Sequence, residues 1–112
     1  MRIALTGDVM LGRWVDRYVI RNQSVRPHAL WGDVLPIMLG TDCRLINLEC
    51  VISNQGEKWH PTTKEFRFRA GPRALDFLQA AQIDGVTLAN NHVLDYGTDA
   101  LLDCLKLLDR VP

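Results

Sequence analysis

An α/β fold is expected for this chain of 112 residues, because short apolar runs alternate with segments of helical periodicity. The runs at 2–6, 44–48 and 85–89 have the length and composition of core strands. Between and after them, apolar residues recur three and four positions apart, as on one face of a helix. This alternation favours a parallel or mixed sheet with helical crossovers.

The first third of the chain predicts one buried strand followed by two helical segments. The strand 2–6 is expected to close at Gly7-Asp8. Because Pro36 lies inside the weaker helical pattern at 30–38, that helix is expected to be short or kinked. The stronger pattern before it consists of Trp14, Val15, Tyr18 and Val19.

The middle of the chain predicts a strand, a loop and an edge strand. The strand 44–48 ends at Glu49, and the polar stretch 53–64 is expected to form a long surface loop of the kind that carries function. Phe66 and Phe68 alternate with arginines, which is typical of a half-buried edge strand.

The last third predicts a helix, a strand and a second helix. Pro72 suits the first position of a helix whose buried face holds Leu75, Leu78 and Ala81. The strand 85–89 follows, and the last helix is expected to start near Thr98. Its apolar positions give the strongest helical signal in the chain: Leu101, Cys104, Leu105 and Leu108.

Composition excludes several classes of protein. Thirteen basic residues balance thirteen acidic ones, without a basic block, so nucleic acid is not an expected partner. No apolar run approaches the roughly 20 residues that span a bilayer, and no signal peptide is evident. As written, the chain is therefore expected in the cytoplasm, or at the membrane or outside the cell if an upstream anchor is missing. The three cysteines lack metal or disulfide spacing and are expected to be small core residues: Cys43, Cys50 and Cys104.

Polar residues follow each predicted core strand. Asp8, Glu49, Asn91 and His92 would meet at one sheet edge if the strands are parallel, since ligands of open α/β sheets bind there. Two carboxylates, an amide and an imidazole suit a divalent cation such as Mn²⁺, Zn²⁺, Fe²⁺ or Mg²⁺. The alternative for each residue is a cap or turn role, which Asp and Asn often have after strands.

Other candidate sites carry weaker signals. The glycines of 7–13 have P-loop spacing, but Arg13 and Trp14 stand where that loop needs Lys and then Ser or Thr, so nucleotide binding is rejected. His28 and His60 are expected to be solvated loop residues. A further group could face an anionic ligand but is more typical of a solvated surface: Trp59, His60, Lys64, Arg67 and Arg69.

Three ordered motifs resemble the capsule-synthesis CapA family. They are Gly7-Asp8-Val9-Met10-Leu11-Gly12-Arg13, Asn47-Leu48-Glu49, and Leu88-Ala89-Asn90-Asn91-His92 with Asp95-Tyr96-Gly97. This family, also called the poly-γ-glutamate synthesis proteins, is related to the calcineurin-like metallophosphoesterases. The resemblance implies an α/β sandwich of four layers, with helices outside the sheets and a metal centre at the strand ends.

The same resemblance implies roles for individual residues. Asp8 and Glu49 would be metal ligands, and Asn91 and His92 would supply one further ligand and one group facing the leaving oxygen. Arg13 would lie near the site and could bind a carboxylate or phosphate. Together these residues would activate water and neutralise charge in a metal-dependent hydrolysis.

The resemblance also implies that residues 1–112 are the N-terminal part of a larger domain, because family members continue into a second half with further histidines. The metal site is then expected to be incomplete, with a C-terminal half or a second copy of the chain as partner. The expected ligand is an anionic polymer or a small molecule. The alternatives are a non-catalytic component of a capsule-assembly complex and an inactive fragment.

Overall fold

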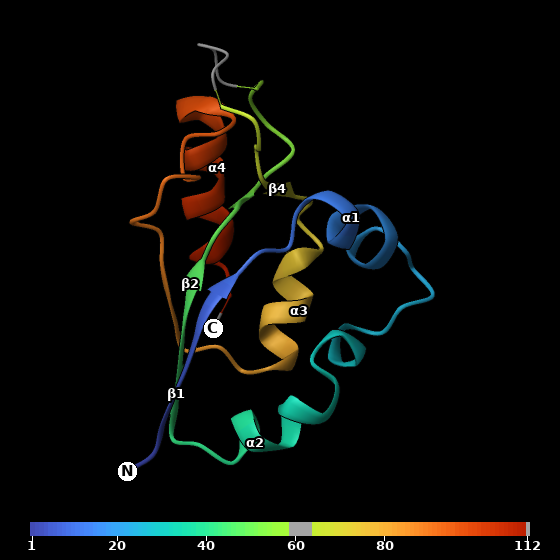
Figure 1. Cartoon of the computed structure of the whole chain (residues 1–112), viewed down its shortest axis with the longest axis vertical. Coiled ribbons are helices and arrows are strands. Elements are labelled where there is room, and N and C mark those ends of the chain that lie inside the picture. The colour runs from blue at the N-terminus through green and yellow to red at the C-terminus, as the bar shows by residue number, and fades with distance from the viewer. Residues whose placement is uncertain (59–63, 112) are drawn as a thin grey trace.

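A parallel three-stranded sheet forms the centre of the computed structural model, which describes residues 1–58 and 64–111 (Figure 1). Its strands are β1 (Ile3–Val9), β2 (Cys43–Leu48) and β5 (Gly85–Thr87), in the order β1-β2-β5. All neighbours are parallel, so their carboxyl ends lie at one edge. The α/β class expected from the sequence is confirmed.

The first strand differs from the expectation in two respects. It does not close at Gly7-Asp8 but continues to Val9, with a register shift between Leu5 and Asp8. Gly7 lies at this irregularity and has φ +73°, a conformation that glycine adopts more readily than other residues. The strand is also not buried, since Leu5 is 73% exposed; β1 is an edge strand, and one of its faces is bare in this chain.

Helical turns connect β1 to β2. A short α1 (Arg13–Val15) runs directly into a π-helical turn η1 (Asp16–Ile20), which matches the periodicity at 14–19. Two 3₁₀ turns follow, η2 (Pro27–Leu30) and η3 (Gly32–Val34), and then α2 (Leu35–Leu39). Pro36 lies in the first turn of α2, where its missing N–H costs nothing, so the expected short helix is confirmed.

A second, two-stranded parallel sheet pairs β3 (Val51–Ile52) with β4 (Arg69–Ala70). The edge strand expected around Phe66 and Phe68 is therefore misplaced. Only the Phe68 carbonyl takes part, accepting a hydrogen bond from the Val51 N–H at 3.2 Å. Strand pairing begins just beyond it because the Phe68 N–H is bound instead by a side chain, Asp95.

Two longer helices complete the fold. Helix α3 (Ala74–Ala80) begins shortly after Pro72, and α4 (Gly97–Leu108) begins one residue before the position expected. Helix α3 lies beside the central sheet, whereas α4 packs on β3. No helix within residues 1–58 and 64–111 is long and apolar enough to cross a membrane.

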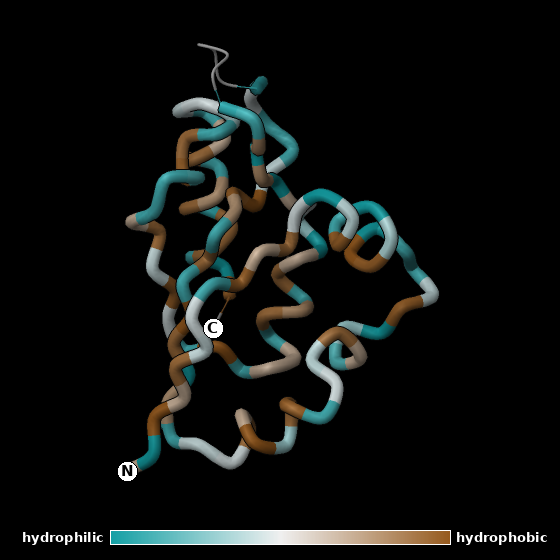
Figure 2. The backbone as a smooth tube through the Cα atoms, in the orientation of Figure 1, coloured by the Kyte–Doolittle hydropathy of each residue, from teal (hydrophilic) through white to brown (hydrophobic). Residues whose placement is uncertain are grey.

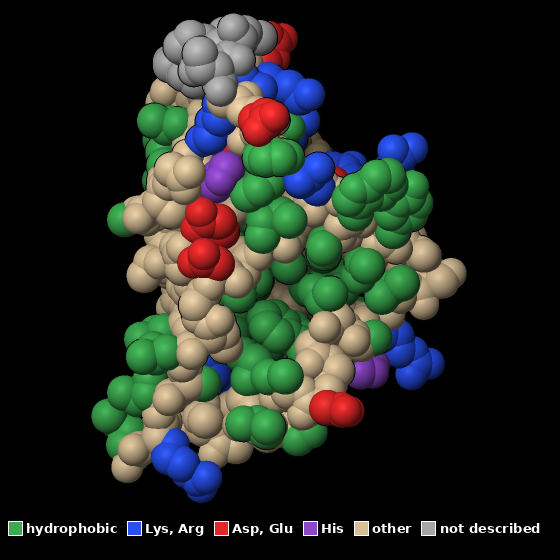
Figure 3. Space-filling view, in the orientation of Figure 1, with side chains coloured by type: hydrophobic (Ala, Val, Ile, Leu, Met, Phe, Trp, Pro, Cys, Tyr) green, Lys and Arg blue, Asp and Glu red, His purple; other side chains and the backbone are tan. Residues whose placement is uncertain are grey.

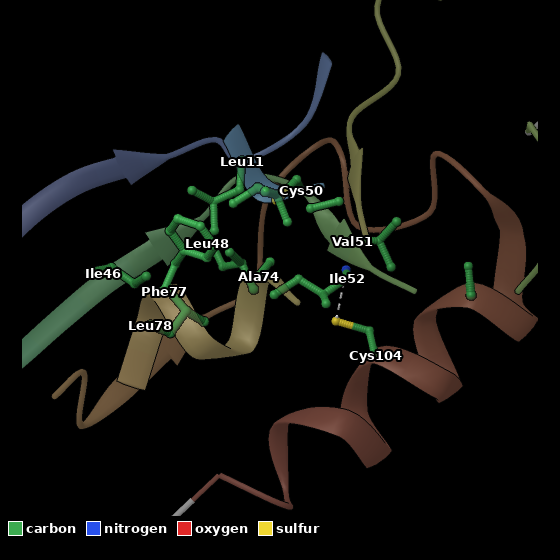
Figure 4. Packing of buried hydrophobic residues seen from close by; sticks show 13 residues of the cluster. Leu11, Ile46, Leu48, Cys50, Val51, Ile52, Ala74, Phe77, Leu78 and Cys104 are labelled. Carbon is green, nitrogen blue, oxygen red and sulfur yellow. Dashed lines mark hydrogen bonds between the residues drawn. The ribbon is translucent and has the colours of Figure 1, made fainter. Parts of the chain in front are cut away.

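Brown, hydrophobic segments of the backbone alternate with teal, hydrophilic ones along the chain (Figure 2). The buried positions meet in one core between the central sheet, α3, β3 and α4 (Figure 4). Cys50 and Cys104 belong to this core, as expected, whereas Cys43 is half-buried. The Ile52 N–H donates to the Cys104 sulfur at 3.3 Å, so one thiol also satisfies the backbone of β3. The cluster comprises Leu11, Ile20, Ile46, Leu48, Cys50, Val51, Ile52, Ala70, Ala74, Phe77, Leu78, Ala100 and Cys104.

Arg44 on β2 is buried but has a structural role. Its guanidinium pairs with Asp84 at 3.0 Å and donates to the carbonyls of Gln82 (2.7 Å) and Thr41 (2.8 Å). These contacts tie the starts of β2 and β5 together at the edge opposite to the polar strand ends. Burial of this charge is tolerated because it is paired and hydrogen-bonded.

Candidate functional site

The carboxyl ends of β1 and β2 bring Asp8 and Glu49 to the same side chain. Asp8 is the register partner of Asn47, whose Nδ2 donates to Asp8 Oδ1 at 2.8 Å. The same Nδ2 atom donates to Glu49 Oε2 at 2.6 Å. Two carboxylate oxygens thus converge on one nitrogen, so the first two polar clusters meet at one sheet edge.

The carbonyl oxygen of the Asn47 side chain connects to β5 and the residues that follow it. Its Oδ1 accepts hydrogen bonds from Thr87 Oγ1 at 2.9 Å and from Asn90 Nδ2 at 3.1 Å. Asn90 Nδ2 also reaches the Leu48 carbonyl at 2.9 Å. With its carbonyl oxygen committed to two donors, the amide of Asn47 can offer only its NH₂ group to the carboxylates, so the orientation of the amide is fixed by its partners.

His92 follows β5 and is held from two directions. Its N–H donates to Asn90 Oδ1 at 3.0 Å, and its ring Nδ1 lies 2.6 Å from Asp95 Oδ2. Asp95 Oδ2 also accepts the Phe68 N–H at 2.7 Å, while Asp95 Oδ1 forms an ion pair with Lys64. Because Asp95 is only 1% exposed, this carboxylate is a buried anchor that orients the imidazole.

Aromatic stacking connects His92 to Arg13. The ring centroids of Phe68 and His92 lie 4.0 Å apart, and those of Phe66 and Phe68 lie 6.5 Å apart. The Arg13 guanidinium lies 4.7 Å from the centroid of Phe66. Arg13 is thus linked to His92 through two phenylalanines, and it forms no ion pair with Asp8 or Glu49.

Asn91 is the least engaged of the predicted site residues. It is exposed, and its side chain makes no hydrogen bond with the described residues, although its carbonyl accepts one from Lys64. The neighbouring Asn90 instead makes the contacts that join β2 to β5. The structure brings together Asp8 and Glu49, links His92 to them through Asn90 and Asn47, and leaves the Asn91 side chain exposed.

The donor set fits a divalent cation in part. Asp8 and Glu49 are unpaired with any Lys or Arg of the described residues, and both reach one atom, as two ligands of a hard cation would. Acidic side chains and a histidine lie close together near the ends of β1 and β2 (Figure 3). Nevertheless, across residues 1–58 and 64–111 no three His, Cys, Asp or Glu side chains form a group that could hold a metal ion.

The residues with weaker predicted roles lie in different places. Lys64 belongs to the site through Asp95, and the Arg69 guanidinium lies on the Tyr96 ring at 4.0 Å. His28 is exposed in η2, away from the strand ends. Trp59 and His60 lie outside the described residues.

The sequence did not reveal that Asn47 joins the two carboxylates or that Asp95 anchors His92. Asn47 and Glu49 are two residues apart, and side chains two apart on a strand point to the same face. That spacing could have identified the pair. His92 and Asp95 are three apart in a turn, a separation at which side chains can meet, but no sequence pattern shows that Phe68 and Lys64 converge on the same carboxylate.

Comparison with known proteins gives consistent matches over almost the whole chain. The sequence model of the bacterial capsule synthesis protein family PGA_cap matches residues 2–112. A probable polyglutamine synthesis accessory protein of Mycobacterium tuberculosis, found in two strains, is 30% identical over 136 residues, covering 95% of this chain and 35% of the relative. The PGA biosynthesis protein CapA of Bacillus subtilis is 24% identical over 102 residues, covering 91% of this chain and 26% of its own length. The chain therefore spans about a third or less of the length of these relatives.

Proposed function

This chain belongs to the bacterial capsule synthesis protein family PGA_cap, and we propose that its strand-end cluster is part of a divalent-metal site used in the synthesis or turnover of a poly-γ-glutamate capsule polymer. The observation that carries the proposal is the convergence of Asp8 and Glu49 on Asn47 Nδ2, at 2.8 and 2.6 Å. Two carboxylates brought together without a basic partner are costly unless something positive joins them.

In the proposed site, Asp8 and Glu49 hold the cation, and Asn47 sets the separation of their carboxylates. A bound divalent cation would supply an activated water and neutralise charge on the group under attack. Because Asp95 occupies the Nδ1 side of the His92 ring, the Nε2 atom remains for contact with a ligand or for accepting a proton. Lys64 balances the charge of the Asp95 carboxylate.

The proposed reaction is hydrolysis of the phosphoesterase type, with His92 as proton carrier and Arg13 as an anion-binding side chain. Support for the role of Arg13 comes from its link to His92 through the rings of Phe66 and Phe68. The further ligands that a catalytic metal centre requires would come from a partner: a region such as the part of the longer relatives that this chain does not cover, or a second copy of the chain.

A second candidate function is a non-catalytic one. The lack of three closely placed His, Cys, Asp or Glu side chains in the described part of the chain favours it, and the mycobacterial relatives are named accessory proteins. In this case the strand-end network would bind polymer or stabilise the fold within a capsule-assembly complex, or the chain would be an inactive fragment.

The test is calorimetric titration of the chain with Mn²⁺, alongside the double variant Asp8→Asn/Glu49→Gln. We expect binding by the wild type and at least a ten-fold loss of affinity in the variant. The matched control, Asp33→Asn/Asp109→Asn, removes two exposed carboxylates elsewhere and should bind as the wild type does. If the wild type binds no Mn²⁺, or if the control loses as much as the variant, the metal site is refuted.

Catalysis is tested separately, by following the release of product from poly-γ-glutamate and from a chromogenic phosphodiester in the presence of Mn²⁺. His92→Ala should abolish any turnover that the wild type shows. Turnover that persists in His92→Ala would exclude His92 as the proton carrier. Metal binding without turnover of either substrate would favour the non-catalytic function.

A further inference from the structure

Two arginines of the first helical segment lie on exposed aromatic rings. Arg17 lies over the rings of both Trp14 and Tyr18, at 6.0 and 5.6 Å, and those rings are stacked at 5.1 Å with only 7° between their planes. Arg13 lies over Phe66. Trp14 is 61% exposed and Tyr18 54%, so these rings are not core residues that happen to reach the surface.

The hydrogen-bonding edges of both guanidinium groups are unused. Among the described residues, neither Arg13 nor Arg17 donates a hydrogen bond or forms an ion pair. The nearest carboxylate along the helix, Asp16, is committed to Arg21 at 2.6 Å and to the Gly71 N–H at 2.8 Å. A guanidinium held beside a ring without a hydrogen-bonded partner still has its N–H donors available, and these donors can bind a carboxylate through two hydrogen bonds.

The two arginines also line one pocket. Arg13, Trp14 and Arg17 together line a shallow pocket of about 310 Å³. The backbone of Arg13 is held at φ +53°, an uncommon conformation for a residue other than glycine, and Gly12 before it packs against the Arg69 backbone. This sharp turn fixes where the Arg13 side chain leaves the helix.

We propose that Arg13 and Arg17, supported by Trp14, Tyr18 and Phe66, form a binding subsite for carboxylate groups spaced along an extended polymer. The inference rests on the proposed function, because a polymer carboxylate on Arg13 would lie at the end of the stacked series that leads to His92. The occupant is a polycarboxylate rather than a nucleic acid. The chain is neutral overall, and it offers two guanidinium groups without hydrogen-bond partners instead of an extended basic face.

The experiment measures fluorescence anisotropy of a labelled γ-linked glutamate oligomer titrated with the chain at low salt. Arg17→Gln should weaken binding about three-fold and Arg13→Gln/Arg17→Gln about ten-fold or more, since charge-assisted pairs at an exposed site are individually modest. The charge-matched control is Arg2→Gln/Arg26→Gln, which removes two exposed arginines outside the pocket and should change affinity less than two-fold.

Arg17→Lys distinguishes recognition of a carboxylate through paired guanidinium hydrogen bonds from simple charge attraction. It keeps the positive charge but loses the planar guanidinium and its paired donors, so it should bind the oligomer as weakly as Arg17→Gln. The subsite is overturned if Arg17→Lys binds like the wild type, if the control pair loses as much affinity as the Arg13/Arg17 pair, or if the wild type does not bind. Tighter binding of a single-stranded oligonucleotide of equal charge would also overturn it.

Mn²⁺ titration of the same variants distinguishes this inference from the proposed function. Arg17→Gln should bind Mn²⁺ as the wild type does, because Arg17 forms no ion pair with Asp8 or Glu49. Oligomer binding that survives in Asp8→Asn/Glu49→Gln would support the subsite even if the metal site were refuted.

Discussion

His92 Nδ1 lies 2.6 Å from Asp95 Oδ2, and Asp95 is almost completely removed from solvent. One buried carboxylate therefore holds the imidazole, the Phe68 backbone and Lys64 in one arrangement. The polar strand end after β5 and the segment that leads into β4 are joined through this residue, although they are far apart in the sequence.

Asp95→Asn should release the His92 ring. The amide cannot pair with Lys64, and it would accept from Phe68 or from His92 with a weaker bond, so unfolding should become easier by about 1–3 kcal/mol. Chemical denaturation measures this change, and ¹⁵N NMR of the imidazole should show a shift in the population of its tautomers. Asp99→Asn, an exposed position on α4, is the control; an equal effect there would contradict the anchoring role.

Replacing Asn47 tests the junction between the two carboxylates. Asn47→Ala removes hydrogen bonds to Asp8, Glu49, Thr87 and Asn90, so stability should fall by about 1–3 kcal/mol in thermal or denaturant unfolding.

Asn47→Asp places a third carboxylate at the same point and should be less stable than the wild type because like charges repel. Its melting temperature should rise more with Mn²⁺ than that of the wild type, since a cation bound to the folded state stabilises it. A melting temperature of Asn47→Asp that does not respond to Mn²⁺ would argue against a cation at this position.

Two glycines with nearly the same φ should respond differently to alanine. Gly7 has φ +73°, and a Cβ added there would meet no atom within 4 Å, so Gly7→Ala should cost only the strain of that conformation, about 1 kcal/mol. At Gly56, with φ +75°, the added Cβ would lie 2.3 Å from the Tyr96 carbonyl, so Gly56→Ala should cost about 2–4 kcal/mol. Denaturant unfolding compares the two, and equal costs would show that the 53–58 segment can move away from α4.

The buried cysteines should be slow to react. Burial raises the pKa of Cys50 to about 12 and raises that of Cys104, which leaves little thiolate at neutral pH. Alkylation followed by mass spectrometry at pH 8 should label Cys43 at least ten-fold faster than the other two. Comparable rates for all three would mean that the core opens readily.

The raised pKa of Cys50 predicts that the stability of the fold depends on pH. An unfolded Cys50 has a pKa near 9, whereas the folded one has a pKa of about 12. The folded state therefore binds the extra proton between these values, and stability falls as the pH rises from about 9 toward 12. Cys50→Ala should flatten this decline in a series of denaturant unfolding curves, and an unchanged slope would contradict the assignment to Cys50.

Local pattern predicted the elements that are long or regularly spaced. The i, i+3, i+4 spacing of Leu101, Cys104 and Leu105 identified α4 to within a residue of its start, although Leu105 is 42% exposed and the helix buries Ala100 and Cys104. The same reasoning misjudged burial of β1, since apolar composition predicts a strand but not whether a neighbouring layer covers it. It misplaced β4 because the N–H of Phe68 pairs with Asp95, a residue distant in sequence.

The sequence by itself indicated the alternation of the three central strands with helices, the family, and the polar residues that follow the strands, because these depend on spacing along the chain. Only the tertiary structure decided how those residues meet: that Asn47 joins Asp8 to Glu49, that Asp95 holds His92, and that the Asn91 side chain faces solvent. Each of these contacts depends on the register of β1 on β2 and on the path of the segment before β4. Register and path are set by packing across the whole core, which spacing along one strand does not specify.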